Sequence, residues 1–332
     1  MLVSIITVYY NREDHVIDSI MSLLSQTYES IEVIAIDDGS TDNTYENLLS
    51  IKDPRYSVIS HKNMGFVKSV IKGVALAKGD YVAIHGSGDI SYPRRIEKQK
   101  DVLMNNDKIG LVGCYVNNYN SIKEQSNVLK PVIPKELDLT QAIRQRNFFT
   151  HGEVMFRKSV YNQVGGYRDF FKYSQDRDLW MRMSLVTDFH IIPEVLYKRY
   201  MLSDGVSTSS EKIAMQKNFN EISKQCIDLR VKGEPDLIDK YGIYAPFFRR
   251  KSKSVSHELM KISLNDYVEY DLVMAKNIIN LSMNEKRTLI NSLLKFMIVM
   301  SIRNKLFYKT TSNIIRFLKQ TKRSLNSNRE ED

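Results

Sequence analysis

The chain has 332 residues, 42% of them hydrophobic, a formal net charge of +9, and ordinary numbers of glycine (14) and proline (7). This composition excludes a disordered or collagen-like chain and allows one large domain or two ordinary ones. The two cysteines, Cys114 and Cys226, provide neither a disulfide framework nor the spacing of a metal site.

The chain opens with a strand–helix–strand pattern. The apolar runs LVSIITVYYN and IEVIAIDDGS flank residues 13–27, whose apolar positions have helical spacing. Continuous apolar strands joined by a crossover helix predict a parallel sheet that is covered on both faces. Because ligands of such sheets bind at the carboxyl ends of the strands, polar residues at these ends are binding-site candidates.

Alternating strands and helices continue to about residue 210. The predicted strands cover 56–60, 81–84, 109–116, 153–157 and 191–201, and the predicted helices cover 67–77, 93–104, 139–146 and 175–185. Beyond residue 211, glycine and proline become rare and helix-forming residues dominate. We therefore predict an α/β domain at 1–210 and an all-helical extension at 211–332.

The C-terminal segment 303–323 carries seven basic residues and no acidic one, interleaved with aromatic and aliphatic residues. This pattern is typical of a helix that binds anionic lipid, and equally of a terminal helix with its basic face in solvent. The apolar run 296–302 is too short to cross a bilayer, and the N-terminus has no signal-peptide pattern. We expect a cytoplasmic protein, with the inner face of the membrane as a candidate contact and no nucleic-acid partner.

Five segments resemble, in the same order, the inverting family 2 glycosyltransferases of the GT-A fold. These segments are VSIITVYYNRE, IEVIAIDDGSTDNT, the Asn63-Met64-Gly65 turn, GDYVAIHGSGDISYPRRIEKQ and VMFRKSVYNQVGGYRDFFKYSQDRDLWMRMS. The resemblance covers residues 1 to about 205. It implies a Rossmann-like, mostly parallel sheet with helices on both faces. It also implies a hexosyltransferase that uses a nucleotide-diphosphate sugar and a glycan or lipid-linked acceptor in bacterial surface polysaccharide synthesis.

The nucleoside pocket is expected at the ends of the first two strands. The resemblance implies that Thr7, Tyr9 and Asn11 line it. The carboxylate of Asp38 can accept from the imide N–H of uracil or from ribose hydroxyls, which favours UDP, although thymine presents the same edge. The alternative interpretation of the segment 37–40 is a helix-capping turn.

The segment Gly86-Ser87-Gly88-Asp89 departs from the family's Asp-x-Asp-Asp cluster, which binds a divalent cation and the diphosphate. Only Asp89 keeps its acid. Because Mg²⁺ often uses one or two carboxylates together with phosphates and waters, we expect Mn²⁺ or Mg²⁺ on Asp89, with Ser87 near the diphosphate. As alternatives, the backbone N–H groups of both glycines can approach a phosphate, and His85 is either a ligand or a packed residue.

The segment QDRDLW resembles the family's Glu-Asp-x-Asp-Leu-Trp pattern, in which the second acid is the catalytic base. This acid is Asp176, and near a helix N-terminus it would stay ionised, as a base must. The alternative is a plain helix N-terminal acid. His151 stands where the family often carries a polar residue that faces the donor, although a packing role is equally consistent.

Further candidates are Arg94 and Arg95 for a phosphate, Arg168 for phosphate or acceptor, and Trp180 for a sugar face, although a solvated helix face is an alternative for the two neighbouring arginines. Two other function classes are a non-catalytic GT-A-like binding subunit and a sugar nucleotidyltransferase. The latter needs a glycine-rich phosphate loop after the first strand, and TVYYNRE is not one.

Overall fold

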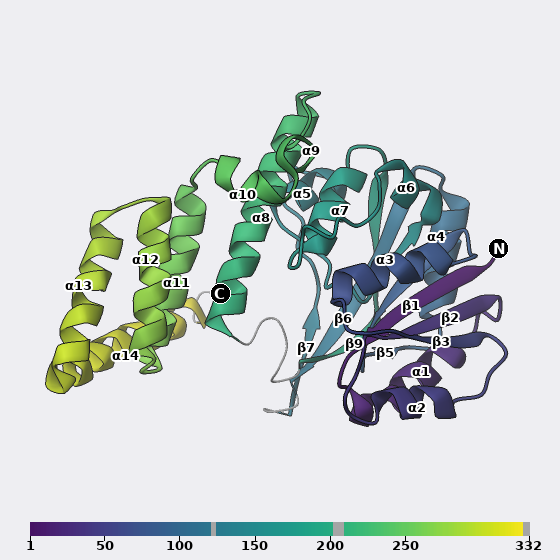
Figure 1. Ribbon diagram of the computed structural model, residues 1–332, viewed down its shortest axis with the longest axis horizontal. Coiled ribbons are helices and arrows are strands. Elements are labelled where there is room, and N and C mark those ends of the chain that lie inside the picture. The colour runs from purple at the N-terminus through teal and green to yellow at the C-terminus, as the bar shows by residue number, and fades with distance from the viewer. Residues whose placement is uncertain (121–123, 202–208, 328–332) are drawn as a thin grey trace. The chain divides into compact units, whose positions relative to one another are not determined.

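The computed structural model describes residues 1–120, 124–201 and 209–327. The chain forms two compact units, one of residues 1–203 with 226–243 and one of residues 204–225 with 244–332 (Figure 1). Residues 226–243 thus belong to the first unit, although they follow the domain limit predicted at residue 210, which stays a prediction.

The first unit is built on a nine-stranded sheet in the order β3-β2-β1-β4-β8-β6-β9-β5, with β7 paired to β6. Its strands are β1 (Val3–Tyr9), β2 (Ile31–Asp37), β3 (Tyr56–Ser60), β4 (Tyr81–Gly86), β5 (Ile90–Ser91), β6 (Ile109–Asn120), β7 (Gln125–Leu129), β8 (Met155–Arg157) and β9 (Asp188–Met201). The strands β3, β2, β1 and β4 are parallel, as are β6 and β9, whereas β8 is antiparallel to both β4 and β6.

Helices cover both faces of this sheet, as predicted. They are η1 (Glu13–His15), α1 (Val16–Leu24), α2 (Thr44–Ser50), α3 (Phe66–Leu76), α4 (Arg95–Asn105), α5 (Leu139–Gln145), α6 (Lys158–Gln163) and α7 (Gln175–Met183). Apolar residues of α1, α2 and α4 form one core with the sheet, and those of α3, α5, α6 and α7 form the other. Alternate residues of β1 contribute to the two cores, because successive side chains of a strand point to opposite faces.

The parallel strands bring their carboxyl ends to one edge of the sheet. Tyr9 at the end of β1 pairs with Asp37 at the end of β2, and Val8 pairs with Gly86 at the end of β4. The loops that leave these three strands therefore lie side by side, and they carry the polar residues that the sequence singled out.

The described residues from 209 onward form helices and turns without strands. The helices are α8 (Ser210–Val231), α9 (Leu237–Tyr241), η2 (Gly242–Tyr244), α10 (Ala245–Phe248), α11 (Lys253–Val268), α12 (Leu272–Glu285), α13 (Leu289–Arg303) and α14 (Lys305–Ser327). Tyr267, Ile279 and Ile298 lie in the main core of the second unit. This confirms the helical C-terminal region.

Candidate functional site

The first part of the site joins the ends of β1 and β2. Asn11 follows β1 with a left-handed backbone (φ +51°), which asparagine tolerates better than most residues. Its Oδ1 accepts from the Thr41 N–H at 2.9 Å, and its own N–H donates to the Ser40 hydroxyl at 3.1 Å. Asp37 supports the same turn, because its carboxylate accepts from the Ser40 N–H at 3.1 Å. Asn11 thus lies at the predicted edge.

The two residues predicted beside Asn11 lie inside the protein. Thr7 is 1% exposed and Tyr9 is fully buried, with its hydroxyl donating to Ser19 at 3.0 Å. Burial raises the pKa of Tyr9 to about 12. This corrects the prediction that both side chains line a nucleoside pocket, since neither offers a surface to a ligand. The aromatic ring presented at this edge belongs to Tyr10, which is 47% exposed because it follows the end of β1.

Asp38 anchors the segment that leads into α3. One carboxylate oxygen accepts from the Met64 N–H at 2.9 Å and the Ser69 hydroxyl at 3.0 Å, and the other accepts from the Gly65 N–H at 3.0 Å. The residue is 2% exposed. One of its oxygens accepts a single bond, but at this burial a direct bond to uracil would require the segment around Met64 and Gly65 to move. Uracil binding by Asp38 therefore stays a prediction.

Asp89 is held by the last strand of the sheet. Its Oδ2 accepts from the Tyr197 hydroxyl at 2.6 Å and its Oδ1 from the Tyr200 N–H at 2.9 Å. The Tyr197 hydroxyl in turn accepts from the Gly86 N–H at 2.9 Å. Burial raises the pKa of the Asp89 carboxyl, and the two hydrogen bonds oppose this shift.

The two glycines of this loop are required by its shape. A Cβ atom on Gly86 would lie 2.2 Å from Oδ2 of Asp89. Gly88 has a φ of +90°, and a Cβ there would lie 2.8 Å from Cβ of His15. Acidic side chains at these positions would therefore force the loop into another conformation.

The loop offers few groups to a phosphate or a cation. The N–H of Gly86 donates to Tyr197, and the N–H of Gly88 donates to the Ser19 hydroxyl at 3.3 Å. Ser87 is partly exposed and has no hydrogen bond to the described residues. The direct approach of the glycine N–H groups to a phosphate is thus not available in this conformation.

The donor set does not fit the cation that the resemblance implies. Asp89 is the one acid of the loop, it is 9% exposed, and both of its oxygens already accept hydrogen bonds. Within residues 1–120, 124–201 and 209–327, no group of three or more His, Cys, Asp or Glu side chains is placed to hold a metal ion. Mg²⁺ and Mn²⁺ require oxygen ligands that are free to coordinate.

His85 and Arg95 form the buried support of the loop. The Nε2 of His85 lies 3.0 Å from both the Ser19 hydroxyl and the Asp89 carbonyl, and burial lowers the pKa of His85 to about 3. Arg95 is fully buried, donates to the Ser91 hydroxyl at 2.8 Å, and is not placed to reach a phosphate. Both residues therefore have a packing role, which corrects the phosphate interpretation of Arg95.

Asp176 has a different environment from Asp89. It lies in the first turn of α7, just after Ser174, whose φ is +61°. Its Oδ2 accepts from the Asn147 side-chain amide at 2.8 Å, and no described residue donates to its Oδ1. The side chain is partly exposed, and the helix N-terminus favours negative charge there. One carboxylate oxygen is therefore available to take a proton.

The turn at His151 and Gly152 connects these parts. The His151 ring lies 5.6 Å from the Phe66 ring and 6.1 Å from the Trp180 ring. Burial lowers the pKa of His151, and the negative charge of Asp176 opposes this shift. The structure thus brings α3, whose start Asp38 anchors, and α7 to the same histidine.

Gly152 makes the link to the loop after β4. A Cβ atom there would lie 2.3 Å from the Tyr197 hydroxyl and 3.2 Å from the Gly86 nitrogen. The 151–152 turn therefore contacts residues next to each of the three predicted acids. Phe66 follows the Gly65 that Asp38 binds, Trp180 lies on the same helix as Asp176, and Tyr197 donates to Asp89.

Two further candidates hold α7 in place. Arg168 is paired with Asp178 and with Asp236, to which its guanidinium donates at 2.7 Å. The carboxylate of Asp178 also accepts from Arg182 at 2.7 Å. Arg168 is thus occupied by ion pairs, and Trp180 is fully buried, so neither is placed to contact phosphate or sugar.

A pocket of about 470 Å³ lies between the start of α3 and the segment before α7. Its lining residues are Asn63, Met64, Gly65, Phe66, Val67, Lys68, Asp169, Lys172 and Tyr173. Phe66 also contacts His151, so this pocket adjoins the turn that connects the candidate residues.

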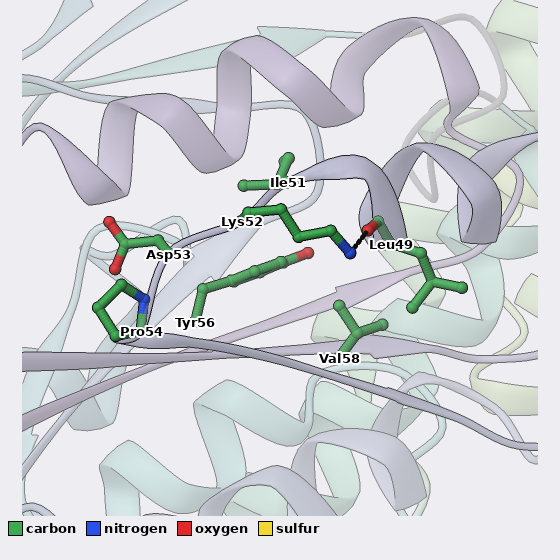
Figure 2. A pocket seen from close by; sticks show the side chains of 7 residues that line it. All are labelled: Leu49, Ile51, Lys52, Asp53, Pro54, Tyr56 and Val58. Atoms are coloured by element: carbon green, nitrogen blue, oxygen red, sulfur yellow. Dashed lines mark hydrogen bonds between the residues drawn. The ribbon is translucent and has the colours of Figure 1, made fainter.

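A second pocket, of about 530 Å³, lies where α2 ends and β3 begins (Figure 2). Lys52 in its wall donates to the Leu49 carbonyl at 2.8 Å, and Asp53 is bonded to Arg55. This pocket is at the amino end of β3, away from the edge that carries Asp37 and Gly86. It is therefore not part of the candidate site.

Residues 4–165 match the family model described as glycosyl transferase family 2. An uncharacterized glycosyltransferase of Methanocaldococcus jannaschii is 30% identical over 59% of this chain and 70% of its own length. The chain belongs to glycosyltransferase family 2. Another relative of this glycosyltransferase, an uncharacterized one from Haemophilus influenzae, is 28% identical over 80% of this chain and 87% of its own. Chondroitin synthase of Escherichia coli is 29% identical over 70% of this chain, which spans 33% of that protein.

The solved structure of S. aureus TarS residues 1–349 in complex with UDP-GlcNAc is similar to this glycosyltransferase, with a TM-score of 0.56. The likeness covers 91% of this chain and 92% of the other, at 14% sequence identity. At this identity the likeness concerns the fold. The predicted GT-A fold with a C-terminal helical region is thereby confirmed.

Proposed function

We propose that this glycosyltransferase is an inverting hexosyltransferase that moves one sugar from a UDP-sugar to a hydroxyl of a glycan or lipid-linked acceptor. The observation that carries the proposal is the Oδ1 of Asp176, to which no described residue donates, on a carboxylate oriented by Asn147 at the start of α7.

The chemical step follows from the position of this carboxylate. The acceptor oxygen attacks the anomeric carbon, and its proton passes to Oδ1 of Asp176. The bond from the anomeric carbon to the diphosphate oxygen breaks on the opposite face, and the nucleoside diphosphate leaves with the bonding electrons. General-base help of this kind contributes about 10²–10⁴-fold to the rate.

The donor site is proposed at the ends of β1 and β2. The exposed ring of Tyr10 can stack on the base, and Asn11 lies beside it. Ser87 and His151 remain proposed neighbours of the diphosphate and the sugar. The complexes of TarS with UDP and with UDP-GlcNAc support a uridine nucleotide.

The acceptor is proposed to enter through the pocket of about 470 Å³. Tyr173 in its wall is followed by Ser174, which precedes α7, and Phe66 in the same wall contacts His151. The pocket therefore leads toward the carboxylate that would activate the acceptor hydroxyl.

We place the enzyme in the synthesis of a bacterial surface polysaccharide, at the inner face of the cell membrane. The similarity to a synthase of chondroitin, which is a polysaccharide, supports the pathway. No helix among the described residues is long and apolar enough to cross a membrane.

Helix α14 supports a peripheral contact. Its described surface combines exposed apolar side chains, Leu306 and Phe317 among them, with the exposed cations Lys305 and Lys309. This combination suits anionic lipid. The side chains of Lys319, Lys322 and Arg323, which belong to the predicted basic segment, lie outside the described residues. Sedimentation with anionic vesicles tests the contact: a Lys305→Glu/Lys309→Glu variant is expected to pellet less, and equal pelleting would contradict it.

A second candidate is a binding subunit that holds a nucleotide sugar without reacting it, and the loop after β4 favours it. Incubation of the purified chain with a panel of nucleotide sugars separates the two functions. The proposal predicts release of UDP from at least one UDP-sugar, with or without an added acceptor. Binding of a UDP-sugar without any release, across donors and acceptors, would favour the binding subunit.

A further inference from the structure

The loop after β4 is closed against a cation by a tyrosine from the last strand of the sheet. We propose that the chain holds the donor diphosphate without a divalent cation. The Tyr197 hydroxyl donates a hydrogen bond to the Asp89 carboxylate, where the cation would otherwise bind, and Arg199 supplies the positive charge. This inference rests on the proposed function, because it concerns the same donor.

The Tyr197 hydroxyl uses both of its hydrogen-bonding capacities inside the loop. It donates to Asp89 at 2.6 Å and accepts from the Gly86 N–H at 2.9 Å. The other oxygen of Asp89 accepts from the Tyr200 N–H at 2.9 Å. A carboxylate oxygen can accept more than one bond, but Asp89 is 9% exposed, so a cation could reach it only through the space that Tyr197 and the Tyr200 backbone fill. A donor displaced in this way would lose its partner, which is costly for a buried group.

Tyr197 is held firmly in this position. It is fully buried, and its hydroxyl fits between Gly86 and Gly152, either of which would collide with the loop or the hydroxyl if it carried a Cβ atom. The Arg95 guanidinium lies 4.8 Å from the centre of its ring, and the His85 ring packs edge-on at 5.5 Å. Gly86 therefore does more than replace an acid, since together with Gly152 it leaves the space that the tyrosine fills.

Arg199 is the cation placed to replace the charge of a metal ion. It lies two residues after Tyr197 on β9, and side chains two apart on a strand point to the same face. Ile90 pairs with Lys198 in the antiparallel pair of β5 and β9, so Arg199 lies on β9 beside the loop that ends at Asp89. It is partly exposed and forms no hydrogen bond or ion pair with the described residues. A guanidinium can bind phosphate oxygens with two parallel hydrogen bonds.

The neighbouring Lys198 contacts two aromatic rings instead of the loop. Its ammonium lies 4.7 Å from the Tyr119 ring and 4.6 Å from the Tyr200 ring. On β9, Lys198 is thus held by aromatic rings, whereas Arg199 has no partner among the described residues. Arg199 lies two residues after Tyr197, whose hydroxyl bonds the carboxylate that a metal ion would need.

Calorimetric titration with UDP tests the proposal directly. We expect the Kd measured in EDTA to lie within about threefold of the Kd measured in MnCl₂. The Arg199→Gln variant should weaken UDP binding about tenfold or more, because it loses charge-assisted hydrogen bonds, and should change uridine binding little. Lys52→Gln removes one charge at the amino end of the sheet and serves as the matched control. UDP binding that requires Mn²⁺ would overturn the proposal.

Direct titration of the chain with Mn²⁺, followed by the electron paramagnetic resonance of the free ion, decides the loop without any nucleotide. The proposal predicts no saturable site that depends on Asp89. A saturable site that Asp89→Asn abolishes, in a variant that keeps its fold, would overturn it. Failure to bind UDP in either buffer would instead contradict the proposed function, and the Mn²⁺ titration would still decide this inference.

Discussion

Asp176 and Asp89 both lie beside the turn at residues 151–152, but they differ in the exposure and in the hydrogen bonding of their carboxylates. Asp176 is partly exposed and receives one hydrogen bond from Asn147, and its Oδ1 has no donor within the described part of the chain. Asp89 is 9% exposed, and donors occupy both of its oxygens. An acid in a family motif can thus be either a reactive group or a structural one. Its hydrogen-bond partners distinguish the two roles.

The largest loss of stability is expected where Arg168 pairs with Asp178 and Asp236 and so holds the helix α7 that carries Asp176. Arg168→Met leaves the buried carboxylates of Asp178 and Asp236 with one arginine each. We expect a loss of about 3 kcal/mol in the free energy of unfolding, at the lower end for a broken buried pair. The fluorescence of Trp180, the one tryptophan of the chain, reports this unfolding.

The control for this variant is Arg94→Met, which breaks an exposed pair with Glu97 and should change the free energy of unfolding much less than Arg168→Met does. Equal effects of the two substitutions would contradict the buried network.

The stability of the protein at acidic pH gives a second test of the same network. Burial acts to raise the pKa of Asp236, but Arg168 and Arg230 outweigh it and lower the pKa to about 2. This stabilisation is present above pH ~4 and is lost as the pH falls toward 2, and Arg168→Met should reduce the loss.

The Asp89 side is tested by Tyr197→Phe. Loss of the hydroxyl leaves the Gly86 N–H without its acceptor and Asp89 without one donor. We expect a destabilisation of about 1–3 kcal/mol in denaturant unfolding. Tyr45→Phe is the matched control, since the Tyr45 hydroxyl has no hydrogen bond to the described residues. If the Tyr197 and Tyr45 variants lose the same stability, the closed loop is not supported.

His85 sharpens the comparison through pH. Burial lowers its pKa to about 3 in the folded state, so between pH 6.5 and 3 the unfolded chain takes up a proton that the folded one does not. Stability should therefore fall as the pH drops below about 6.5, by up to about 1.4 kcal/mol per pH unit from this group. His85→Asn should make the slope shallower, whereas substitution of the exposed His257 should not. An unchanged slope in His85→Asn would show that this histidine titrates normally.

The sequence predicts the architecture because it depends on local periodicity. The apolar runs before Asn11 and Asp38 and the acid Asp176 were sufficient to place the sheet edge and the candidate base. The burial of Tyr9 and the exposure of Tyr10 depend on the residue at which β1 ends, and periodicity does not fix this residue, because both faces of the strand are buried.

The partners of the buried charges could not be predicted in this way. Tyr197 reaches Asp89 from 108 residues away, and no local pattern indicates this bond. The same is true of Asp236, whose pairing with Arg168 accompanies the placement of residues 226–243 in the first unit. Such contacts follow from the tertiary fold, so the metal prediction for Asp89 rested on its position alone.

The central claim is that Asp176 is the base of a transfer from a UDP-sugar. The most direct measurement compares transfer by the wild type and by Asp176→Asn, with UDP binding measured in parallel and Asp188→Asn, an exposed acid at the start of β9, as control. The account predicts that Asp176→Asn binds UDP like the wild type but transfers sugar about 10²–10⁴-fold more slowly. Near-normal transfer by folded Asp176→Asn would contradict it.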